Sequence, residues 1–260
     1  MIWLLYIVVI VFIIATIANT FIQVETYTFA DERIREDLNL LVVSDLHSER
    51  FGRNNGKLIR KIRELNCDAV VMPGDIFELK KDMTPSFELL EGLDKPFFYT
   101  TGNHECNCDI EDFAKRVIER YGGTSLHGNM VEFRGINICG IDDRRSKNTI
   151  QAEEEQKIID MKKDGYTILL YHHPEMIGFF KKSGVDLVVC GHAHGGQWRI
   201  PFIHRGIFAP SQGFFPKYTE GVHDLGKTKL FIGRGLSRKP FIVPRLFNRP
   251  QLAIIQLRQK

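Results

Sequence analysis

Residues 38–47 read LNLLVVSDLH, an apolar run that ends on an aspartate and a histidine. A short run of Leu and Val of this kind predicts a strand buried inside a sheet. Residues 57–65, KLIRKIREL, follow with apolar residues spaced three or four apart, which predicts an amphipathic helix. Because short apolar runs and helical patterns keep alternating after this point, the sequence predicts an α/β domain.

The same pattern continues through most of the chain. Further helices are predicted over 110–120, with Asp109 as the N-cap, and over 149–163. Residues 24–29 form a candidate edge strand that opens the domain. The remaining predicted strands are rich in Val, Ile, Phe and Tyr, and they cover 69–72, 96–100, 136–141, 166–171, 185–190, 229–232, 241–243 and 252–257.

Chemically active side chains gather where the predicted strands end. Six of the nine histidines lie in five short loops, beside glycines that allow a close approach of the backbone. In an α/β domain, functional residues collect at the carboxyl ends of strands. The loops read Asp45-Leu46-His47, Gly74-Asp75, Gly102-Asn103-His104-Glu105, His172-His173-Pro174 and Gly191-His192-Ala193-His194.

The spacing within these loops is typical of metal chelation. In extended Asp-x-His or His-x-His, positions i and i+2 point to the same side, so both side chains reach one ion. Oxygen and imidazole donors without thiolate suit Mn²⁺, Fe or Zn²⁺, with Mn²⁺ our first choice, and donors in excess of four indicate two ions. Asp75 is the natural bridging carboxylate. A single histidine is more often structural, and that interpretation stands for His173, His127, His204 and His223.

These five loops, in this order, resemble the calcineurin-like dinuclear metallophosphoesterase superfamily over about residues 38–257. The resemblance implies two face-to-face mixed β-sheets flanked by helices, two divalent metal ions, and a metal-bridging hydroxide that attacks a phosphoester or pyrophosphate bond. It also implies that His104 contacts the phosphate or protonates the leaving oxygen. The implied ligands are Asp45, His47, Asp75 and His194 for one ion and Asp75, Asn103, His172 and His192 for the other.

A narrower resemblance comes from residues 191–202, GHAHGGQWRIPF, with Pro210, FPK at 215–217 and NRP at 248–250. These residues are similar to a bacterial branch of membrane-associated phosphohydrolases that includes UDP-2,3-diacylglucosamine pyrophosphatases. That similarity implies a lipid-linked or nucleotide-activated substrate. One departure concerns phosphate binding: many superfamily members continue the second loop with an acid and an arginine, whereas here Glu78 is followed by Leu79.

The first 23 residues differ in kind from the rest. Residues 2–22 contain no charged side chain and, at about 1.5 Å per helical residue, reach across a hydrocarbon layer of about 30 Å. We therefore predict a transmembrane anchor over 1–23, a catalytic domain over 24–260, and a single-pass location in the cell membrane. A cleaved signal peptide is disfavoured because the start lacks Lys or Arg. Arg33, Arg35 and the odd count of five cysteines favour a cytoplasmic domain, but an exported domain is left open.

Composition limits the classes of binding partner. A net charge of +3, with acidic and basic residues interleaved, shows no signature of a basic nucleic-acid-binding groove and disfavours a nuclease. A non-catalytic scaffold stabilised by metal is the alternative from another class, and the intact His104 argues against it. Oligomeric state and the roles of Cys106 and Cys108 are not readable from the residues.

Two groups of residues carry alternative interpretations. Four arginines either contact phosphate or anionic headgroups or form a solvated basic tail, namely Arg234, Arg238, Arg245 and Arg249. Four aromatic residues either line a lip for a lipid chain or pack in the core, namely Trp198, Phe202, Phe214 and Phe215.

Overall fold

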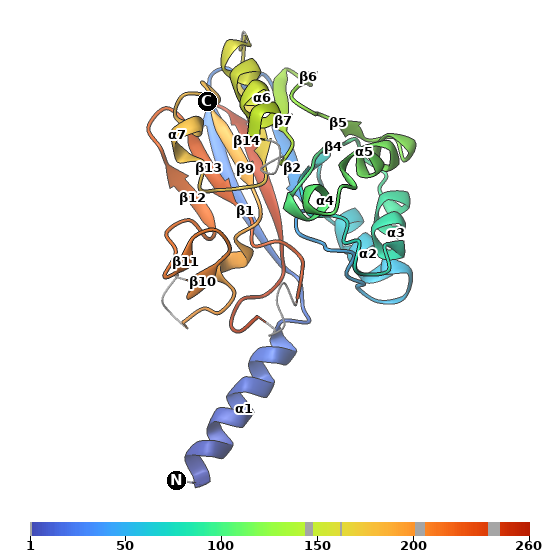
Figure 1. Ribbon diagram of the computed structural model, residues 1–260, viewed down its shortest axis with the longest axis vertical. Coiled ribbons are helices and arrows are strands. Elements are labelled where there is room, and N and C mark those ends of the chain that lie inside the picture. The colour runs from blue at the N-terminus through green and yellow to red at the C-terminus, as the bar shows by residue number, and fades with distance from the viewer. Residues whose placement is uncertain (1, 144–147, 162, 201–205, 239–244) are drawn as a thin grey trace.

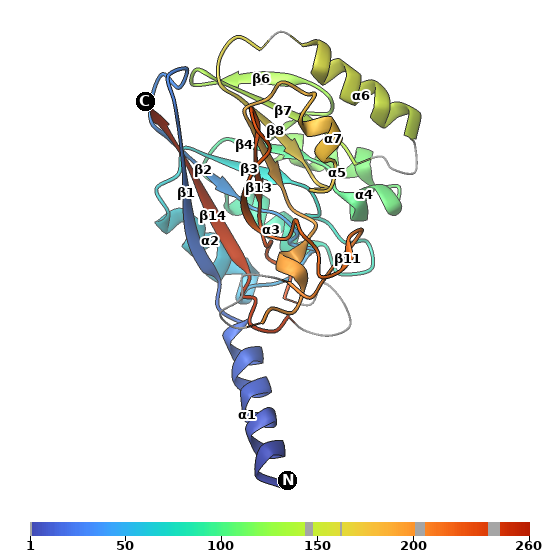
Figure 2. The same ribbon diagram turned by 90° about the vertical axis from the view of Figure 1, so that its left-hand side faces the viewer.

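Two mixed β-sheets pack face to face in the computed structural model, which describes residues 2–143, 148–161, 163–200, 206–238 and 245–260 (Figures 1 and 2). The first six-stranded sheet runs in the order β1 (Gln23–Asp31), β14 (Gln251–Gln259), β2 (Leu38–Val42), β3 (Ala69–Pro73), β4 (Phe97–Thr100), β5 (Thr124–Ser125). The second runs β12 (Gly221–Asp224), β13 (Lys229–Ile232), β9 (Leu187–Cys190), β8 (Thr167–Tyr171), β7 (Ile136–Ile141), β6 (Met130–Phe133).

The main core lies between the two sheets. It joins Leu40 and Val71 of the first sheet to Ile168 and Val189 of the second, all of them buried. The central strands are apolar on both faces because each sheet is also covered on its outer face. β2, β3 and β4 run parallel to one another, as do β7, β8 and β9, so within each sheet their carboxyl ends lie at one edge.

Helices cover the outer faces. α2 (Gly56–Glu64), α3 (Thr84–Gly92) and α5 (Glu111–Arg120) pack their apolar residues onto the first sheet. α6 (Asn148–Asp160) and α7 (Ile177–Phe180) pack onto the second. Short elements complete the described chain: α4 (Asn103–Asn107), the 3-10 turns η1 (Arg53–Asn55) and η3 (His194–Gly196), and the hairpin of β10 (Phe208–Ala209) with β11 (Gly213–Phe214).

The predicted sandwich of two mixed sheets is confirmed, and the long apolar runs all form strands where the structure describes them. The predicted strand over 241–243 lies outside the described residues. Two helix boundaries were wrong. The helix predicted over 149–163 ends at Asp160, and Asp109 does not cap α5, because it takes a left-handed conformation (φ 52°) while Ile110 occupies the cap position.

The apolar N-terminus forms α1 (Ile2–Ala18), which leaves the body of the domain in both views (Figures 1 and 2). No helix in the described part of the chain is long and apolar enough to cross a membrane, so the predicted transmembrane helix is not supported. α1 has 17 residues because the chain turns after Ala18, where the amides of Thr20 and Phe21 bond back to Ile17 and Ala18.

Candidate metal centre

The loops that follow β2, β3, β4, β8 and β9 converge at the edge shared by the two sheets. Asp45 and His47 follow β2, Asp75 follows β3, and Asn103 opens α4 just after β4. The second sheet contributes His172 after β8 and both His192 and His194 after β9. All seven predicted ligands therefore lie around one place, and their contacts divide them into two groups.

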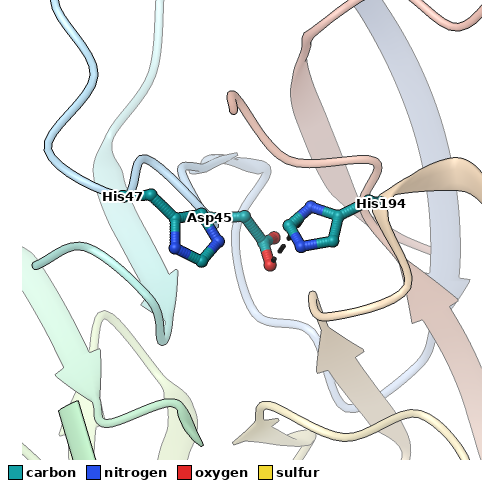
Figure 3. Close-up of side chains that lie close together, drawn as sticks. All are labelled: Asp45, His47 and His194. Atoms are coloured by element: carbon teal, nitrogen blue, oxygen red, sulfur yellow. Dashed lines mark ion pairs between the residues drawn. The ribbon is translucent and has the colours of Figure 1, made fainter. Parts of the chain in front are cut away.

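Asp45, His47 and His194 form the first group, and their donor atoms all lie within 4.8 Å of one another (Figure 3). The Nδ1 atom of His194 is 3.9 Å from Oδ1 of Asp45. All three side chains are buried. One carboxylate and two imidazoles at this spacing provide a facial set of donors for a divalent transition metal.

The second group combines Asp75, His172 and His192 with Asn103. Oδ1 of Asn103 lies 3.0 Å from Nε2 of His172 and 2.8 Å from Nδ1 of His192. The other ring nitrogen of His172 is 2.8 Å from the carbonyl oxygen of Pro73, which fixes Nδ1 as the N–H donor. Nε2 of His172 then faces Oδ2 of Asp75, 3.1 Å away, and is the ring nitrogen that a bound metal would use.

Asp75 connects the two groups. Its Oδ2 atom lies 3.1 Å from Nε2 of His172 and 3.6 Å from Nε2 of His47. Burial by itself would raise the pKa of this carboxyl, but the facing imidazoles of His172 and His47 hold the pKa well below its ordinary value. Asp75 is thus ionised and placed between the groups, as a bridging carboxylate must be.

The residues present fit a pair of metal ions. Oδ2 of Asp45, Nε2 of His47 and Oδ2 of Asp75 are buried, and none has a hydrogen-bond partner within the described chain. Unpaired buried polar atoms are costly, so three at one place indicate a missing cationic partner. Glycine makes the space: a Cβ on Gly102 would lie 2.2 Å from Oδ1 of Asp75, and one on Gly235 would lie 2.4 Å from Oδ2 of Asp45.

Backbone strain is concentrated in the same loops. Five of the predicted ligands are non-glycine residues with positive φ, between 47° and 66°: Asp45, His47, Asp75, His192 and His194. Each such residue costs of order 1–3 kcal/mol and persists where the surroundings over-determine it, which is typical of functional sites. The strain directs donors from different strands toward a common centre.

His104 lies beside the first group without belonging to the predicted ligands. Its ring is 4.3 Å from that of His47, and its side chain is 36% exposed, so it faces the solvent side of the site. Nδ1 of His104 lies 2.5 Å from Oε2 of Glu78, which is also 3.7 Å from Nδ1 of His47. Hydrogen bonding to His47, followed by the His104 charge, lowers the pKa of Glu78 to about 2.

Sequence reasoning missed the role of Glu78. The available signal was a lone acid three residues after Asp75 in an otherwise apolar loop. It also gave no role to Glu105, whose buried carboxylate accepts hydrogen bonds from four backbone amides, those of Gly102, Asp75, Ile76 and Phe77. Glu105 thereby ties the second and third loops together.

His173, the neighbour of a predicted ligand, contacts two carboxylates and lies beside the predicted ligand His192. Its Nε2 atom is 2.5 Å from Oδ2 of Asp143, and its Nδ1 atom is 3.1 Å from Oε1 of Glu175. It is held between two carboxylates, while its ring stacks 3.9 Å from that of His192. His173, Glu175 and His192 form a further group of potential donors within 4.8 Å of one another, so the structural role of His173 stays a prediction, while His172 faces Asn103 and Asp75.

The family model for calcineurin-like phosphoesterases matches residues 38–196 of this chain. The chain belongs to that family. Curated relatives include the uncharacterized metallophosphoesterase Cj0846 of Campylobacter jejuni, 29% identical over 87% of this chain and 61% of its own length. Phosphodiesterase YaeI of Escherichia coli is 30% identical over 84% of this chain and 81% of its own length. The chain thus spans about three fifths of the first relative and most of the second.

Solved structures agree on the fold. The TT1561 protein of Thermus thermophilus superimposes with a TM-score of 0.52 at 12% identity, covering 78% of this chain and 92% of that one. The calcineurin-like family is one of dinuclear, metal-dependent phosphoesterases. The two donor groups are the candidate positions of its ions.

Proposed function

We propose that this phosphoesterase cleaves a phosphodiester or pyrophosphate bond, with two divalent ions held by the seven residues of the two donor groups. The observation that carries the proposal is the position of Asp75, an ionised carboxylate between the two donor groups, with Oδ2 3.1 Å from Nε2 of His172 and 3.6 Å from Nε2 of His47. When bound, a pair of ions supplies an activated water and neutralises charge on the phosphoryl group.

The protein's own residues position the site and supply a proton to the leaving oxygen. Glu78 accepts a hydrogen bond from Nδ1 of His104, which fixes the ring and leaves Nε2 to face an incoming substrate. An imidazole that binds no metal is free to donate a proton to a leaving oxygen. Glu105 holds the loops of Asp75 and Asn103 at a fixed separation through its four amide contacts. We assign His104 as the general acid.

A lipid-linked or nucleotide-activated phosphate is the substrate class we favour. The resemblance of residues 191–202 to UDP-2,3-diacylglucosamine pyrophosphatases supports it. Exposed aromatic side chains support it as well: Phe214 and Phe215, on and just after β11, are 71% and 75% exposed. That hairpin adjoins the site, because Oγ of Ser211 lies 3.2 Å from Nε2 of His192.

We also propose that α1 holds the enzyme against a membrane. Trp3, Ile10 and Ile14 are among its exposed side chains, and exposed apolar surface of this extent is typical of a contact with lipid or protein. Flotation of the full chain with anionic lipid vesicles tests the contact. We expect wild type to float and the double variant Ile10→Asp, Ile14→Asp to stay with the soluble fraction; equal flotation would remove α1 from the proposal.

Hydrolysis of bis(p-nitrophenyl) phosphate by the Mn²⁺-loaded full chain tests the proposed reaction. We expect turnover that requires the metal and falls by about 10²–10⁴-fold in His104→Gln. Asp75→Asn is expected to lose both turnover and one equivalent of manganese. The matched control is His223→Gln, which lies outside the donor groups and contacts the Glu220 carbonyl.

Two results would decide against this function. Turnover that is unchanged in both His104→Gln and Asp75→Asn would place the reaction elsewhere. Two bound ions with no turnover of the aryl diester or of a panel of lipid pyrophosphates would favour the metal-stabilised scaffold.

A further inference from the structure

The four arginines near the C-terminus differ sharply in what they contact. Three of them have protein partners: Arg234 pairs with Glu25 and Glu220, Arg238 pairs with Glu49, and Arg249 donates to the carbonyl of Phe21. The fourth, Arg245, has no carboxylate partner within the described chain. A solvated basic tail does not describe these residues, because Arg234 and Arg245 are both buried.

Arg245 is completely buried, at 0% exposure. Its guanidinium makes one hydrogen bond, from Nη2 to Nδ1 of His194 at 3.3 Å. Nε and Nη1 have no partner among the described residues. Within the described chain, therefore, buried N–H donors of this side chain have His194 as their one acceptor.

An uncompensated buried charge is among the costliest features a fold can carry, with a penalty of several kcal/mol. Folds retain such a group where a ligand of opposite charge completes it. Arginine is the side chain that proteins use most often to bind phosphate oxygens, because its N–H donors keep their charge and point in fixed directions. The partnerless Nε and Nη1 donors of Arg245, which lie on different edges of the guanidinium, thus indicate anionic oxygens nearby.

Hydrogen bonds hold the backbone of Arg245 and of Leu246, which positions the buried side chain. Its amide bonds to the carbonyl of Arg238 at 3.3 Å, and its carbonyl accepts from the side chain of Asn19 at the end of α1. The next amide, of Leu246, bonds to the carbonyl of Gln197 at 3.4 Å. None of these contacts involves the guanidinium.

The position of Arg245 relates it to the candidate metal centre. It contacts His194 of the first donor group. The predicted ligands His47 and His194 are themselves only 3% and 4% exposed, so Arg245 and this donor group are buried together.

We propose that Arg245 is a substrate-binding residue whose partnerless N–H donors contact oxygens of the phosphoryl group beside the first donor group. The inference rests on the proposed function, because it assumes that a phosphate ester occupies the centre.

Calorimetric titration of the Mn²⁺-loaded full chain with inorganic phosphate tests this assignment without requiring turnover. We expect Arg245→Met to bind phosphate at least about tenfold more weakly, since hydrogen bonds to a charged group contribute roughly 1.5–3 kcal/mol. The phosphate affinity of Arg245→Lys, which keeps the charge but not the guanidinium donors, should lie between those of wild type and Arg245→Met. The control is Arg238→Met, which removes an arginine paired with Glu49 and should leave phosphate affinity unchanged.

Two further readouts separate substrate binding from a structural role. The manganese content of Arg245→Met should equal that of wild type, and its thermal midpoint without phosphate should be no lower, because the variant removes an unpaired buried charge. If Arg245→Met does not fold, Arg245→Lys decides through the same titration.

The proposal is overturned if Arg245→Met binds phosphate as wild type does, if wild type binds none, or if the variant loses manganese together with phosphate. Arginine-dependent phosphate binding without hydrolysis of any ester would instead sustain this anion site and refute the proposed reaction.

Discussion

Glu78 is the residue whose contacts most directly link metal binding to proton transfer. One carboxylate oxygen lies 2.5 Å from His104 and 3.7 Å from His47, so it orients a predicted acid and a predicted ligand together. Partners of this kind fix tautomer and ring orientation, and removing them costs about 10–100-fold in activity or metal affinity. We predict that Glu78→Gln lowers kcat/KM for the aryl diester by this factor.

The measurement is steady-state kinetics with manganese content determined on the same samples. Glu88→Gln serves as the control, because Glu88 pairs with Arg50 on the surface and does not touch the site. Equal kcat/KM in Glu78→Gln and wild type would show that His104 needs no partner.

Gly102 sets the closest backbone approach in the site. A Cβ at this position would lie 2.2 Å from Oδ1 and 2.6 Å from the amide nitrogen of Asp75, and neither atom can give way without moving the loop. We predict that Gly102→Ala loses manganese binding and turnover together. Gly178→Ala is the matched control, since a Cβ there meets nothing within 4 Å. Metal analysis checks the outcome, and full manganese occupancy in Gly102→Ala would contradict it.

Residue-level prediction from sequence worked where a side chain's role follows from its own strand. Asp45 and His47, or His192 and His194, are recognisable because they are two residues apart at the end of an apolar run. The contacts of Glu78 with His104 and of Arg245 with His194 span 26 and 51 positions. Such pairs depend on how whole loops fold, so they cannot be predicted from the spacing of residues within one segment.

At the element scale, a buried ion pair joins α5 to the carboxyl end of β7. Nζ of Lys115 lies 2.7 Å from Oδ2 of Asp142, whose other oxygen accepts from the amide of Thr101. Burial would raise the pKa of Asp142, but hydrogen bonding from His127 and the charge of Lys115 hold it well below its ordinary 3.8. Breaking such a pair costs about 3–5 kcal/mol, so we predict that loss for Asp142→Asn at pH 7.

The sign of the pH dependence follows from the depressed pKa. Stability from Asp142 is complete above the unfolded value of 3.8 and is lost as pH falls through the lower folded-state value. The stability gap between wild type and Asp142→Asn should therefore be constant from neutral pH down to about 5 and shrink below about 4. Urea unfolding of both proteins in EDTA measures it. Asp112→Asn, an exposed partner of the same lysine, should change little; a gap that persists undiminished at pH 3 would refute the assignment.

Elements were predictable from sequence in proportion to their length and burial. The strands from β2 to β9 that carry the site lie within runs of Val, Ile and Leu, and these runs specify buried strands unambiguously. β10, β11 and α7 have two to four residues each and carry too little periodicity to detect. At α1 the apolar pattern was read correctly as helix, but its end was set by the turn after Ala18, which composition alone does not reveal.

At the scale of the whole molecule, the candidate centre lies across the joint between the two sheets. Asp45, His47, Asp75 and Asn103 come from loops of the first sheet, whereas His172, His192 and His194 come from loops of the second. Ions bound there would crosslink the sheets in addition to serving the reaction. The sequence predicted this convergence only through the family resemblance, because the facing of two sheets is not encoded in any one segment.

Metal removal should therefore destabilise the entire domain and not only the loops. A ligand that binds only the folded state stabilises it by RT ln(1 + [L]/Kd), about 2.7 kcal/mol at a concentration of 100 Kd. We predict that EDTA lowers the thermal midpoint of the full chain, and that added Mn²⁺ restores it with a rise that continues as the logarithm of the free metal concentration. Asp75→Asn, which lacks the carboxylate between the two groups, should respond far less. Differential scanning calorimetry across a series of manganese concentrations checks both expectations. A thermal midpoint that is the same with and without EDTA would show that bound metal does not stabilise the packing of the two sheets.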